Sequence, residues 1–346
     1  MVAGEYVVTG DDRVVAARRF LVAQGLQAAD EQSHWTPLTG GVSSDLWRVD
    51  LPGRTLCVKA ALSRLRVADD WSAPLERNAV EYDWLSFARE HVPGSCPRLL
   101  GQDVQAGFFA MEYLPADDHP QWKATLLAGD VDPEFAGRVG DVVGRLHAAS
   151  AGDESVRRRF ATDANFDALR IAPYLRVTAG RNPGVADRLH DLADRLAGTR
   201  LALVHGDLSP KNILVHPTTP ILLDAECAWF GDPAFDLAFC LTHLLLKSRV
   251  RTDRAGPLRE SADRLLAAHR RHLDWEPPHE FDERVAGLVP ALLLARVDGA
   301  SPVEYLTAPG DRSLVRDTAV LLLRSRLGRT AEVLDSGMAA LAPLHA

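Results

Sequence analysis

The hydrophobic positions follow two different periods in the first part of the chain. Residues 11–25 repeat apolar side chains at helical spacing and stop at a glycine, so they predict an amphipathic helix. The pattern then changes to alternation, bounded by a Gly/Ser turn and by a Pro-Gly turn, which is typical of short strands in a small antiparallel sheet. The predicted strands are 35–38, 46–49 and 56–60.

A second helix and two further strands extend this region. Ser72-Ala73-Pro74 forms a helix start, and apolar residues continue at helical spacing to about Arg89. Alternating segments at 98–103 and 108–112 then complete an antiparallel five-stranded sheet with one helix inserted after its third strand. A segment rich in Pro and Asp follows. We therefore predict a nucleotide-binding N-terminal lobe at 1–114 and a C-terminal lobe at 115–346.

The C-terminal lobe is predicted to be larger and mainly helical. Helical spacing covers 133–150, 166–178 and 185–197, and helices resume after a compact stretch of short β runs between 201 and 223. The fold class is therefore α+β with two lobes.

Composition excludes several classes of protein. The 346 residues are 47% hydrophobic and 25% charged, which is typical of a folded soluble chain. A net charge of -8 gives no electrostatic basis for binding nucleic acid or an anionic membrane, and mildly favours cationic substrates. The N-terminus has no signal-like pattern, and four cysteines lie far apart without a CxxC pair, so we expect reduced thiols and a cytoplasmic protein.

Lysine is rare in this chain. It occurs only at 59, 123, 211 and 247, whereas every other Lys/Arg position carries arginine. A lysine kept against this background indicates a need for a compact ammonium group instead of a planar guanidinium.

The densest chemical signal is the segment LVHGDLSPKNILV at 203–215. Apolar runs flank a polar loop in which Asp207 and Asn212 are separated by four residues. Phosphoryl transfer needs a carboxylate for the acceptor hydroxyl and an oxygen ligand for Mg²⁺, and this spacing supplies both. A short apolar run then ends at Asp224, with Glu226 two positions later. Carboxylates at the end of a strand suit Mg²⁺, so Asp224 is the expected ligand and Glu226 a second one, directly or through water.

These motifs carry a resemblance to a family. HGDLSPKN followed by DAECAWFGDPAFDLA resembles the aminoglycoside phosphotransferase and choline kinase group of small-molecule kinases, relatives of the protein kinases. The Asp-x-Glu form looks especially like the methylthioribose kinase branch. The resemblance implies a bilobal protein-kinase-like fold with its active site between the lobes. It also implies that Asp207 is catalytic, that Asn212 and Asp224 hold Mg²⁺, and that Asp236 anchors the loop.

The N-terminal half contains matching parts in the order that the family requires. Glycines and serines between two strands suit a turn that covers phosphate groups, where small residues let backbone N–H groups approach. Lys59 on the third strand matches the family's phosphate-binding lysine, with Glu81 as its expected partner and Glu76 as the less favoured alternative. The residues of the turn are Gly40, Gly41, Ser43 and Ser44.

Two further sets of residues complete the predicted site. The resemblance places Glu112, Tyr113 and Leu114 where backbone groups hold an adenine ring, which favours ATP over GTP. Lys211, inside the loop, either neutralises the transferring phosphoryl group or points to solvent. Polar and aromatic residues in the apolar C-terminal helices are candidates for the acceptor pocket. The alternative explanation is buried ion pairing, for example of Arg296 with Asp298 or with a neighbouring helix. These candidates are Arg170, Tyr174, Arg296, Asp298 and Tyr305.

The sequence thus predicts an ATP- and Mg²⁺-dependent phosphotransferase that acts on a hydroxyl of a small polar molecule. The acceptor is an aminoglycoside or nucleoside antibiotic, with a role in antibiotic resistance, or a methylthioribose-like sugar. The alternative is a nucleotide-binding pseudokinase that acts as a regulatory or interaction module, although none of Lys59, Asp207 and Asp224 is missing. A protein kinase is disfavoured, because the nine-residue step from Asp224 to Pro233 leaves little room for an activation loop.

Overall fold

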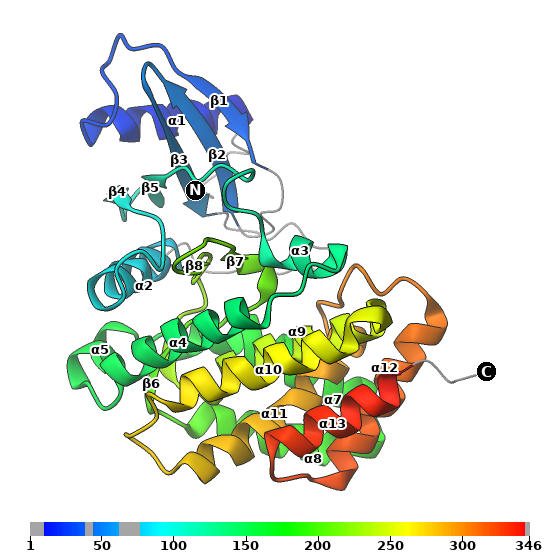
Figure 1. Cartoon of the computed structure of the whole chain (residues 1–346). Helices are drawn as coiled ribbons and strands as arrows, with labels where there is room; N and C mark the ends of the chain where they lie inside the picture. Colours follow the sequence, from blue (N-terminus) through cyan, green and yellow to red (C-terminus); the bar gives the residue numbers. More distant parts are fainter. Residues whose placement is uncertain (1–9, 39–43, 62–76, 343–346) are drawn as a thin grey trace, which may run out of the picture. The chain divides into compact units, whose positions relative to one another are not determined.

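The structure is a computed structural model that describes residues 10–38, 44–61 and 77–342 (Figure 1). Its contacts divide the chain into two compact units. Unit 1 contains the described residues of 1–86 and 97–115, and unit 2 contains those of 87–96 and 116–346. Helix α2 (Arg77–His91) begins in unit 1 and ends in unit 2. A single functional boundary near residue 114 stays a prediction.

Unit 1 contains the five-stranded antiparallel sheet that the alternating pattern predicted, and this prediction is confirmed. The strand order is β1-β2-β3-β5-β4. Leu51 pairs with Arg54 across the Pro52-Gly53 turn, where Gly53 adopts a φ of 75° that only glycine takes without strain. The strands are β1 (His34–Pro37), β2 (Ser44–Leu51), β3 (Arg54–Ala61), β4 (Leu99–Asp103) and β5 (Phe108–Glu112).

The hydrophobic core of unit 1 determines where Lys59 points. Helix α1 (Gly10–Ala23) packs on one face of the sheet, and the ring of Phe20 stacks on that of Phe108 with centroids 5.8 Å apart. Leu56 and Val58 of β3 belong to this core. Because side chains alternate along a strand, Lys59 points to the opposite face of the sheet.

Unit 2 is mainly helical, as predicted. Helix α4 (Pro133–Ser150) has the predicted bounds, and α8 (Ala186–Gly198) differs by one residue at each end. Helix α9 (Ala234–Val250) is buried at every residue from Ala234 to Ser248, which explains its mostly apolar sequence. The other α-helices of unit 2 are α3 (Trp122–Ala128), α5 (Glu154–Arg159), α6 (Asp163–Phe166), α7 (Val177–Arg181), α10 (Ala255–Arg270), α11 (Pro278–Asp298), α12 (Pro309–Ser325) and α13 (Thr330–Leu341).

Two segments of unit 2 differ from the predicted elements. The helix expected at 166–178 is divided into α6, a π-helix (Asp167–Arg176) and α7; Pro173, inside the π-helix, has no N–H to donate. The β runs form β6 (Ala202–Val204), β7 (Ile213–Leu214) and β8 (Ile221–Leu222), and a further strand, β9 (Trp229–Gly231), pairs with β6. Strand β9 lies beyond the stretch 201–223 to which the sequence assigns short β runs.

Helices α4 and α10 approach each other closely through glycine. A Cβ atom at Gly140 would lie 2.1 Å from the backbone oxygen of Leu265, so no other residue fits there without a backbone shift. The approach brings His147 of α4 within 3.0 Å of His269 of α10, measured between Nδ1 and Nε2.

None of the described helices is long and apolar enough to cross a membrane.

Candidate active site

In unit 1, the structure brings Lys59 and Glu81 together. The Nζ atom of Lys59 lies 2.6 Å from Oε2 of Glu81, and the two side chains are 8% and 2% exposed. Each charge compensates the other, which offsets the cost of removing both from water. Nδ2 of Asn78, one helical turn before Glu81, donates to the backbone oxygen of Gly107 and fixes the start of α2 against the sheet.

The other predicted nucleotide contacts of unit 1 are only partly described. Gly40, Gly41 and Ser43 lie outside the described residues, and so does Glu76; Ser44 is the buried first residue of β2. Glu112 ends β5, and its backbone N–H donates to the oxygen of Arg98 at 2.8 Å. The guanidinium of Arg48 lies 5.0 Å from the ring centroid of Tyr113, which precedes Leu114. The adenine contact at these residues stays a prediction.

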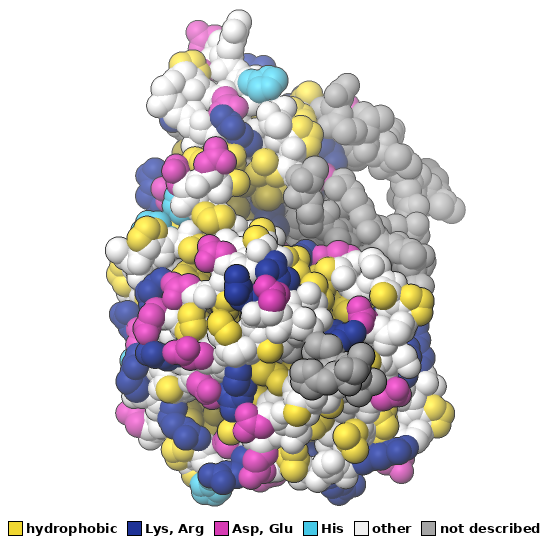
Figure 2. Space-filling model, turned by 45° about the vertical axis from the view of Figure 1, so that its right-hand side comes forward, with side chains coloured by type: hydrophobic (Ala, Val, Ile, Leu, Met, Phe, Trp, Pro, Cys, Tyr) yellow, Lys and Arg dark blue, Asp and Glu magenta, His cyan; other side chains and the backbone are white. Residues whose placement is uncertain are grey.

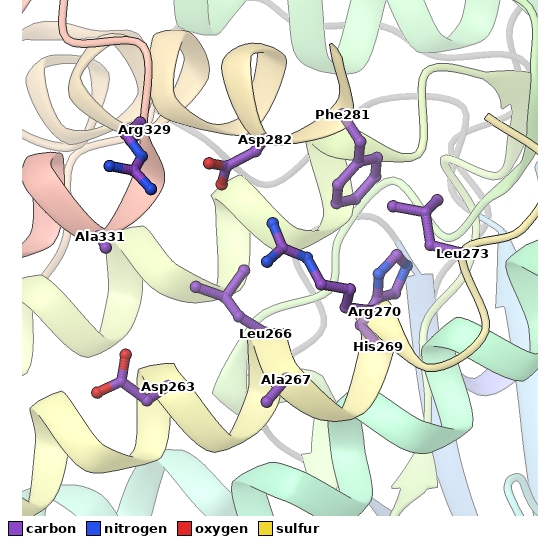
Figure 3. Close-up of a pocket in the computed structure, with 10 residues that line it drawn as sticks. All are labelled: Asp263, Leu266, Ala267, His269, Arg270, Leu273, Phe281, Asp282, Arg329 and Ala331. Carbon is purple, nitrogen blue, oxygen red and sulfur yellow. The ribbon is translucent and has the colours of Figure 1, made fainter. Parts of the chain in front are cut away.

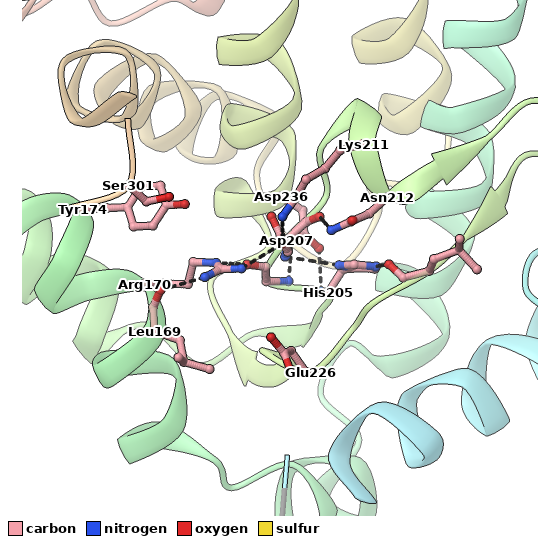
Figure 4. A network of polar contacts seen from close by, with 12 residues as sticks. Leu169, Arg170, Tyr174, His205, Asp207, Lys211, Asn212, Glu226, Asp236 and Ser301 are labelled. Carbon is pink, nitrogen blue, oxygen red and sulfur yellow. Dashed lines mark hydrogen bonds and ion pairs between the residues drawn. The ribbon is translucent and has the colours of Figure 1, made fainter. Parts of the chain in front are cut away.

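In unit 2, the HGD loop (205–212) is held by a carboxylate from α9 (Figure 4). Asp236, 1% exposed, accepts hydrogen bonds from the backbone N–H groups of His205 at 2.7 Å and Gly206 at 2.9 Å. Gly206 has a φ of 77°, and a Cβ atom there would lie 2.4 Å from the backbone oxygen of Cys227. The loop therefore has one backbone path, fixed by Asp236 on one side and by close packing on the other.

His205 orders the loop from within. Its Nδ1 accepts the backbone N–H of Asp207 at 3.1 Å, so Nε2 carries the proton and donates to the oxygen of Leu223 at 3.1 Å. Burial lowers the pKa of His205 in spite of the nearby carboxylates. The ring is therefore neutral and structural.

Asp207 is the buried carboxylate at the centre of this loop. Its Oδ2 atom lies 3.0 Å from NH2 of Arg170 and 3.0 Å from Nζ of Lys211. Burial alone would raise the pKa of Asp207, but the positive charges of Lys211 and Arg170 outweigh it and hold the pKa below its usual value. The carboxylate is therefore ionised at neutral pH.

Arg170 reaches Asp207 from the π-helix. Its Nε donates to the backbone oxygen of Gly206, and its guanidinium lies over the rings of Tyr174 and Phe239, at 5.6 and 5.9 Å from their centroids. Helical segments of this kind are rare and often occur at functional sites. Arg170 thus holds both the backbone and the side chain of the loop, whereas sequence reasoning assigned it to the acceptor pocket.

The predicted metal ligands lie next to one another. Nδ2 of Asn212 donates to the backbone oxygen of Asp207 at 3.0 Å, which leaves Oδ1 of the amide available to a cation. The N–H of Leu223 donates to the backbone oxygen of Asn212 at 2.9 Å, so the hairpin of β7 and β8 brings Asp224 beside it. Asp224 has a φ of 65°, which is uncommon for any residue but glycine and frequent at functional sites.

This donor set fits Mg²⁺. An amide oxygen and a carboxylate are hard ligands, and Mg²⁺ normally keeps water or phosphate oxygens in its remaining positions. In the described part of the chain, no group of three or more His, Cys, Asp or Glu side chains gathers to hold a metal by itself. Glu226 is 8% exposed, and its backbone oxygen accepts a hydrogen bond from Nδ2 of Asn165.

The residues predicted for the acceptor pocket separate into two groups by their contacts. NH1 of Arg296 donates to the hydroxyl of Tyr174 at 3.1 Å, and the hydroxyl of Tyr305 lies 3.3 Å from Nδ1 of His243. Asp298 instead forms a two-point ion pair with Arg316 of α12, at 2.7 and 2.5 Å. The alternative explanation, ion pairing within the helix or with a neighbouring helix, thus describes Asp298, whose partner is Arg316 of α12 and not Arg296.

Sequence reasoning missed His243 and Lys247 of α9. Together with Asp236 and Phe239 they follow a spacing of three, four and four residues, which places all four on one face of the helix. The hydroxyl of Tyr305 contacts His243, and its ring centroid lies 5.0 Å from Nζ of Lys247. The available signal was a lysine inside an apolar helix of a chain that otherwise uses arginine.

Two buried histidines, His147 and His269, lie next to Asp236 in series. Nε2 of His147 lies 3.3 Å from Oδ2 of Asp236, and its Nδ1 contacts His269. Burial lowers the pKa of His269 well below its usual value, so that ring is neutral.

His269, Arg270 and Phe281 also line a cavity of about 340 Å³ (Figure 3). No residue of the HGD loop lines this cavity.

Charged side chains of both signs are interspersed on the face of unit 2 that Figure 2 shows. This mixture accompanies the net charge of -8.

The fold and the HGD loop place this chain in the class of protein-kinase-like folds. Several solved structures share this fold. A choline/ethanolamine kinase family protein from Mesorhizobium loti has a TM-score of 0.54 at 16% identity, over 95% of this chain and 99% of that one. An ethanolamine kinase from Plasmodium vivax has a TM-score of 0.55 at 11% identity, over 97% and 90%. An amicoumacin kinase solved with AMP-PNP, Ca²⁺ and Ami has a TM-score of 0.55 at 15% identity, over 92% and 96%.

The chain belongs to the phosphotransferase enzyme family, whose sequence model matches residues 34–281. Among characterised proteins, the methylthioribose kinase of Yersinia enterocolitica (serotype O:8 / biotype 1B) is 25% identical over 253 residues, 65% of this chain and 62% of that protein. The methylthioribose kinase of Cronobacter sakazakii is 27% identical over 259 residues, 66% and 63%. The matching region thus spans about three fifths of the length of these relatives.

Proposed function

We propose that this protein transfers the γ-phosphoryl group of ATP to a hydroxyl group of a small polar molecule. The observation that carries the proposal is the state of Asp207, which is buried, ionised and held in one orientation by Arg170 and Lys211. A positioned carboxylate of this kind can orient an acceptor hydroxyl and take its proton.

The described residues divide the work of the reaction. Asp207 receives the acceptor hydroxyl, and the ammonium of Lys211 offsets negative charge that develops beside it. Lys59, oriented by Glu81, binds the donor phosphates. The sequence assigns a phosphate-covering role to Gly40, Gly41, Ser43 and Ser44, of which only Ser44 is among the described residues. No covalent intermediate on the protein is required.

Asn212 and Asp224 would hold Mg²⁺, with Glu226 as a further ligand directly or through water. The bound ion supplies positive charge that offsets the charge of the phosphate oxygens. Because Asp236 and the β7–β8 hairpin fix the loop, these ligands keep their place without rearrangement.

The acceptor is proposed to be a sugar hydroxyl of the kind found in methylthioribose or a nucleoside. The matches to methylthioribose kinases and the Asp224-Ala-Glu226 motif support this choice. An aminoglycoside or another antibiotic is the second candidate, on the strength of the family resemblance.

The test is ADP release from ATP in the presence of Mg²⁺, across methylthioribose, ribose, ribose 5-phosphate, gluconate, nucleosides, aminoglycosides and choline. We expect one class of acceptor to stimulate release, and Asp207→Asn to lower turnover by at least ~10² while ATP binding is kept, as for loss of a general base. Asp253→Asn removes a carboxylate that is 55% exposed and serves as the matched control with normal turnover. Near-normal turnover of Asp207→Asn, or failure of the wild-type protein to bind ATP, contradicts the proposal. ATP binding without turnover on any acceptor indicates the pseudokinase alternative.

A further inference from the structure

Lys247 is a fully buried lysine that has no counter-ion in the described part of the chain. Its side chain is 0% exposed, and among the described residues none offers its Nζ a hydrogen-bond acceptor. The ammonium lies over the ring of Tyr305, with the centroid 5.0 Å away. Buried charges are normally paired, so this arrangement is costly for the protein alone.

The surroundings of Lys247 carry positive charge as well. Nε of Arg296 is also buried without a partner in the described part of the chain. Burial and then the charges of Lys247, Arg296, Lys211 and Lys123 lower the pKa of His243, which lies one turn before Lys247. Four cations thus act on a single buried position.

Carboxylates do not balance these cations. Glu304 is 64% exposed and is tied to Lys123 by an ion pair. Asp298, the other acidic residue near Arg296 in sequence, is engaged by Arg316. A buried water molecule could satisfy hydrogen bonds at Lys247, but it would not compensate its charge. Among the described residues, the cationic cluster of Lys247, His243 and Arg296 therefore has no anion paired with it.

A continuous series of contacts joins this cluster to Asp207. The guanidinium of Arg170, paired with Asp207, lies over the ring of Phe239, and that ring packs against His243 with centroids 5.4 Å apart. His243 contacts Tyr305, which covers Lys247. Along α9, Lys247 lies eleven residues after Asp236, about 16 Å at 1.5 Å per residue. One connected set of side chains on this face of α9 therefore joins Asp207 to Lys247.

We infer that Lys247, His243 and Arg296 form a subsite for an anionic group of the acceptor, a carboxylate or a phosphate, remote from the hydroxyl that is phosphorylated. The inference rests on the proposed function for the place of that hydroxyl at Asp207. It names the substrate class as a hydroxyl compound with one negative charge or more, and it excludes polycationic aminoglycosides. The local charge has the opposite sign to that of the whole chain.

Tyr305 covers the subsite in the structure described here. It lies in the connection between α11 and α12, and its side chain is partly exposed while Lys247 beneath it is not. The ring provides the ammonium with a cation–π contact, which is weaker than an ion pair in the same place. An arriving anion displaces the ring from Lys247 and gains the ion pair.

Binding to the subsite can be measured without catalysis. Because the chain has four lysines, protein labelled with [¹³Cε]lysine gives four side-chain NMR signals, and the signal lost in Lys247→Met is that of Lys247. In the absence of ATP and Mg²⁺, we expect ribose 5-phosphate or gluconate to shift this signal, and ribose and glucose to leave it in place. The two anions distinguish phosphate from carboxylate. Anions that shift only Lys59 or Lys211, or none of the four, overturn the inference.

Variants then test which residues bind the anion. Lys247→Met should weaken the binding of the anion that shifts the signal by about 10- to 100-fold, the usual effect of losing a hydrogen bond to a charged group. Arg254→Met, an exposed arginine in the same unit, is the matched control with unchanged affinity. If Lys247→Met does not fold, the wild-type titration decides the matter alone.

The kinase assay separates this inference from the proposed function. Turnover on anionic acceptors in preference to their neutral counterparts supports both. Preferred turnover on neutral methylthioribose or nucleosides, or turnover on polycationic aminoglycosides, retains the function and overturns the subsite. A shift of the Lys247 signal with no turnover on any acceptor retains the subsite and overturns the function.

Discussion

At the scale of single residues, the two oxygens of Asp207 have different surroundings. Both cations, Arg170 and Lys211, pair with Oδ2, and no described cation pairs with Oδ1. Two ion pairs on one oxygen fix the plane of the carboxylate and reduce the basicity of that oxygen. Oδ1 is therefore the atom that we expect to receive the proton of the acceptor hydroxyl.

Removing Arg170 should impair turnover more than binding. Arg170→Met leaves the oxygen of Gly206 and the carboxylate of Asp207 without this partner, so the loop loses its fixed orientation. We expect kcat to fall by about 10- to 100-fold, with KM for ATP changed less than about twofold, since misplacement of a reacting group acts on the chemical step. Steady-state kinetics on the identified acceptor measure both constants.

The control for Arg170 comes from the same π-helix. Arg176→Met makes the same chemical change at a side chain that is 40% exposed and paired with Asp167, so it should leave kcat unchanged. Arg170→Lys, which keeps a positive charge, should restore part of the turnover. Equal losses of kcat in Arg170→Met and Arg176→Met would show that Arg170 has only a structural effect.

The residues that sequence reasoning found are those whose chemistry depends on a local pattern. The strand position of Lys59 and the spacing of Asp207 and Asn212 are visible in the sequence, and the structure brings Lys59 to Glu81 and Asn212 to Asp207. Lys247 is different, because its burial depends on Tyr305, which follows it by 58 positions. A contact over such a separation leaves no local pattern.

At the scale of elements, regular segments were predicted well and irregular ones were not. Strand alternation gave the five-stranded sheet, and α4 matched because its apolar stripe keeps a constant helical period. The π-helix has the same polar and apolar composition as an α-helix, and only its hydrogen bonds identify it. The sequence therefore predicts that the segment with Arg170 is helical, but not that it is a π-helix.

The close packing of α4 on α10 gives a prediction about stability. Gly140→Ala puts a Cβ atom 2.1 Å from the oxygen of Leu265, so the helices must separate, and we expect a loss of ~2–4 kcal/mol in the free energy of unfolding. Chemical denaturation followed by circular dichroism measures it.

A second glycine of α4 provides the comparison. At Gly137, a Cβ atom would meet Cβ of Arg264 at 3.6 Å, an ordinary contact, so Gly137→Ala should be neutral or stabilising through helix propensity. Similar stabilities of Gly137→Ala and Gly140→Ala would argue against the close approach of α4 and α10. Because this packing joins His147 to His269, Gly140→Ala should also weaken the support of Asp236.

At the scale of the whole molecule, Lys247 makes the stability of the free protein depend on pH. Burial lowers the pKa of Lys247 to about 7, whereas the unfolded chain keeps its usual value near 10.5. Between these two values the unfolded state binds more protons than the folded state, so stability should rise as pH increases from 7 to 10. Below pH 7 both states are protonated, and the full cost of the buried charge is present.

Lys247→Met should therefore stabilise the free protein. We expect a gain of roughly 3–5 kcal/mol near pH 6, which declines as pH approaches 10, because the variant has no charge to bury. Thermal denaturation of both proteins at pH 6, 8 and 10 gives the difference. A variant that is less stable than the wild type at pH 6 would mean that Lys247 contributes to the fold instead of to binding. A variant that is more stable but no longer binds the anion would show that Lys247 lowers the stability of the fold and is kept because it binds the acceptor.

Helix α9 has a consequence for how this protein can change in evolution. One face of the helix carries Asp236, which holds the HGD loop, and Lys247, which lies in the cationic cluster. Because α9 is buried from Ala234 to Ser248, it cannot rotate or slide at one end without moving the other, so adaptation to a new acceptor cannot proceed by shifting α9. Change is confined to side chains of the cluster and to the connection between α11 and α12, where Tyr305 lies and where sequence can vary without disturbing the loop. Divergence of acceptor preference within close relatives should therefore be concentrated in that short connection.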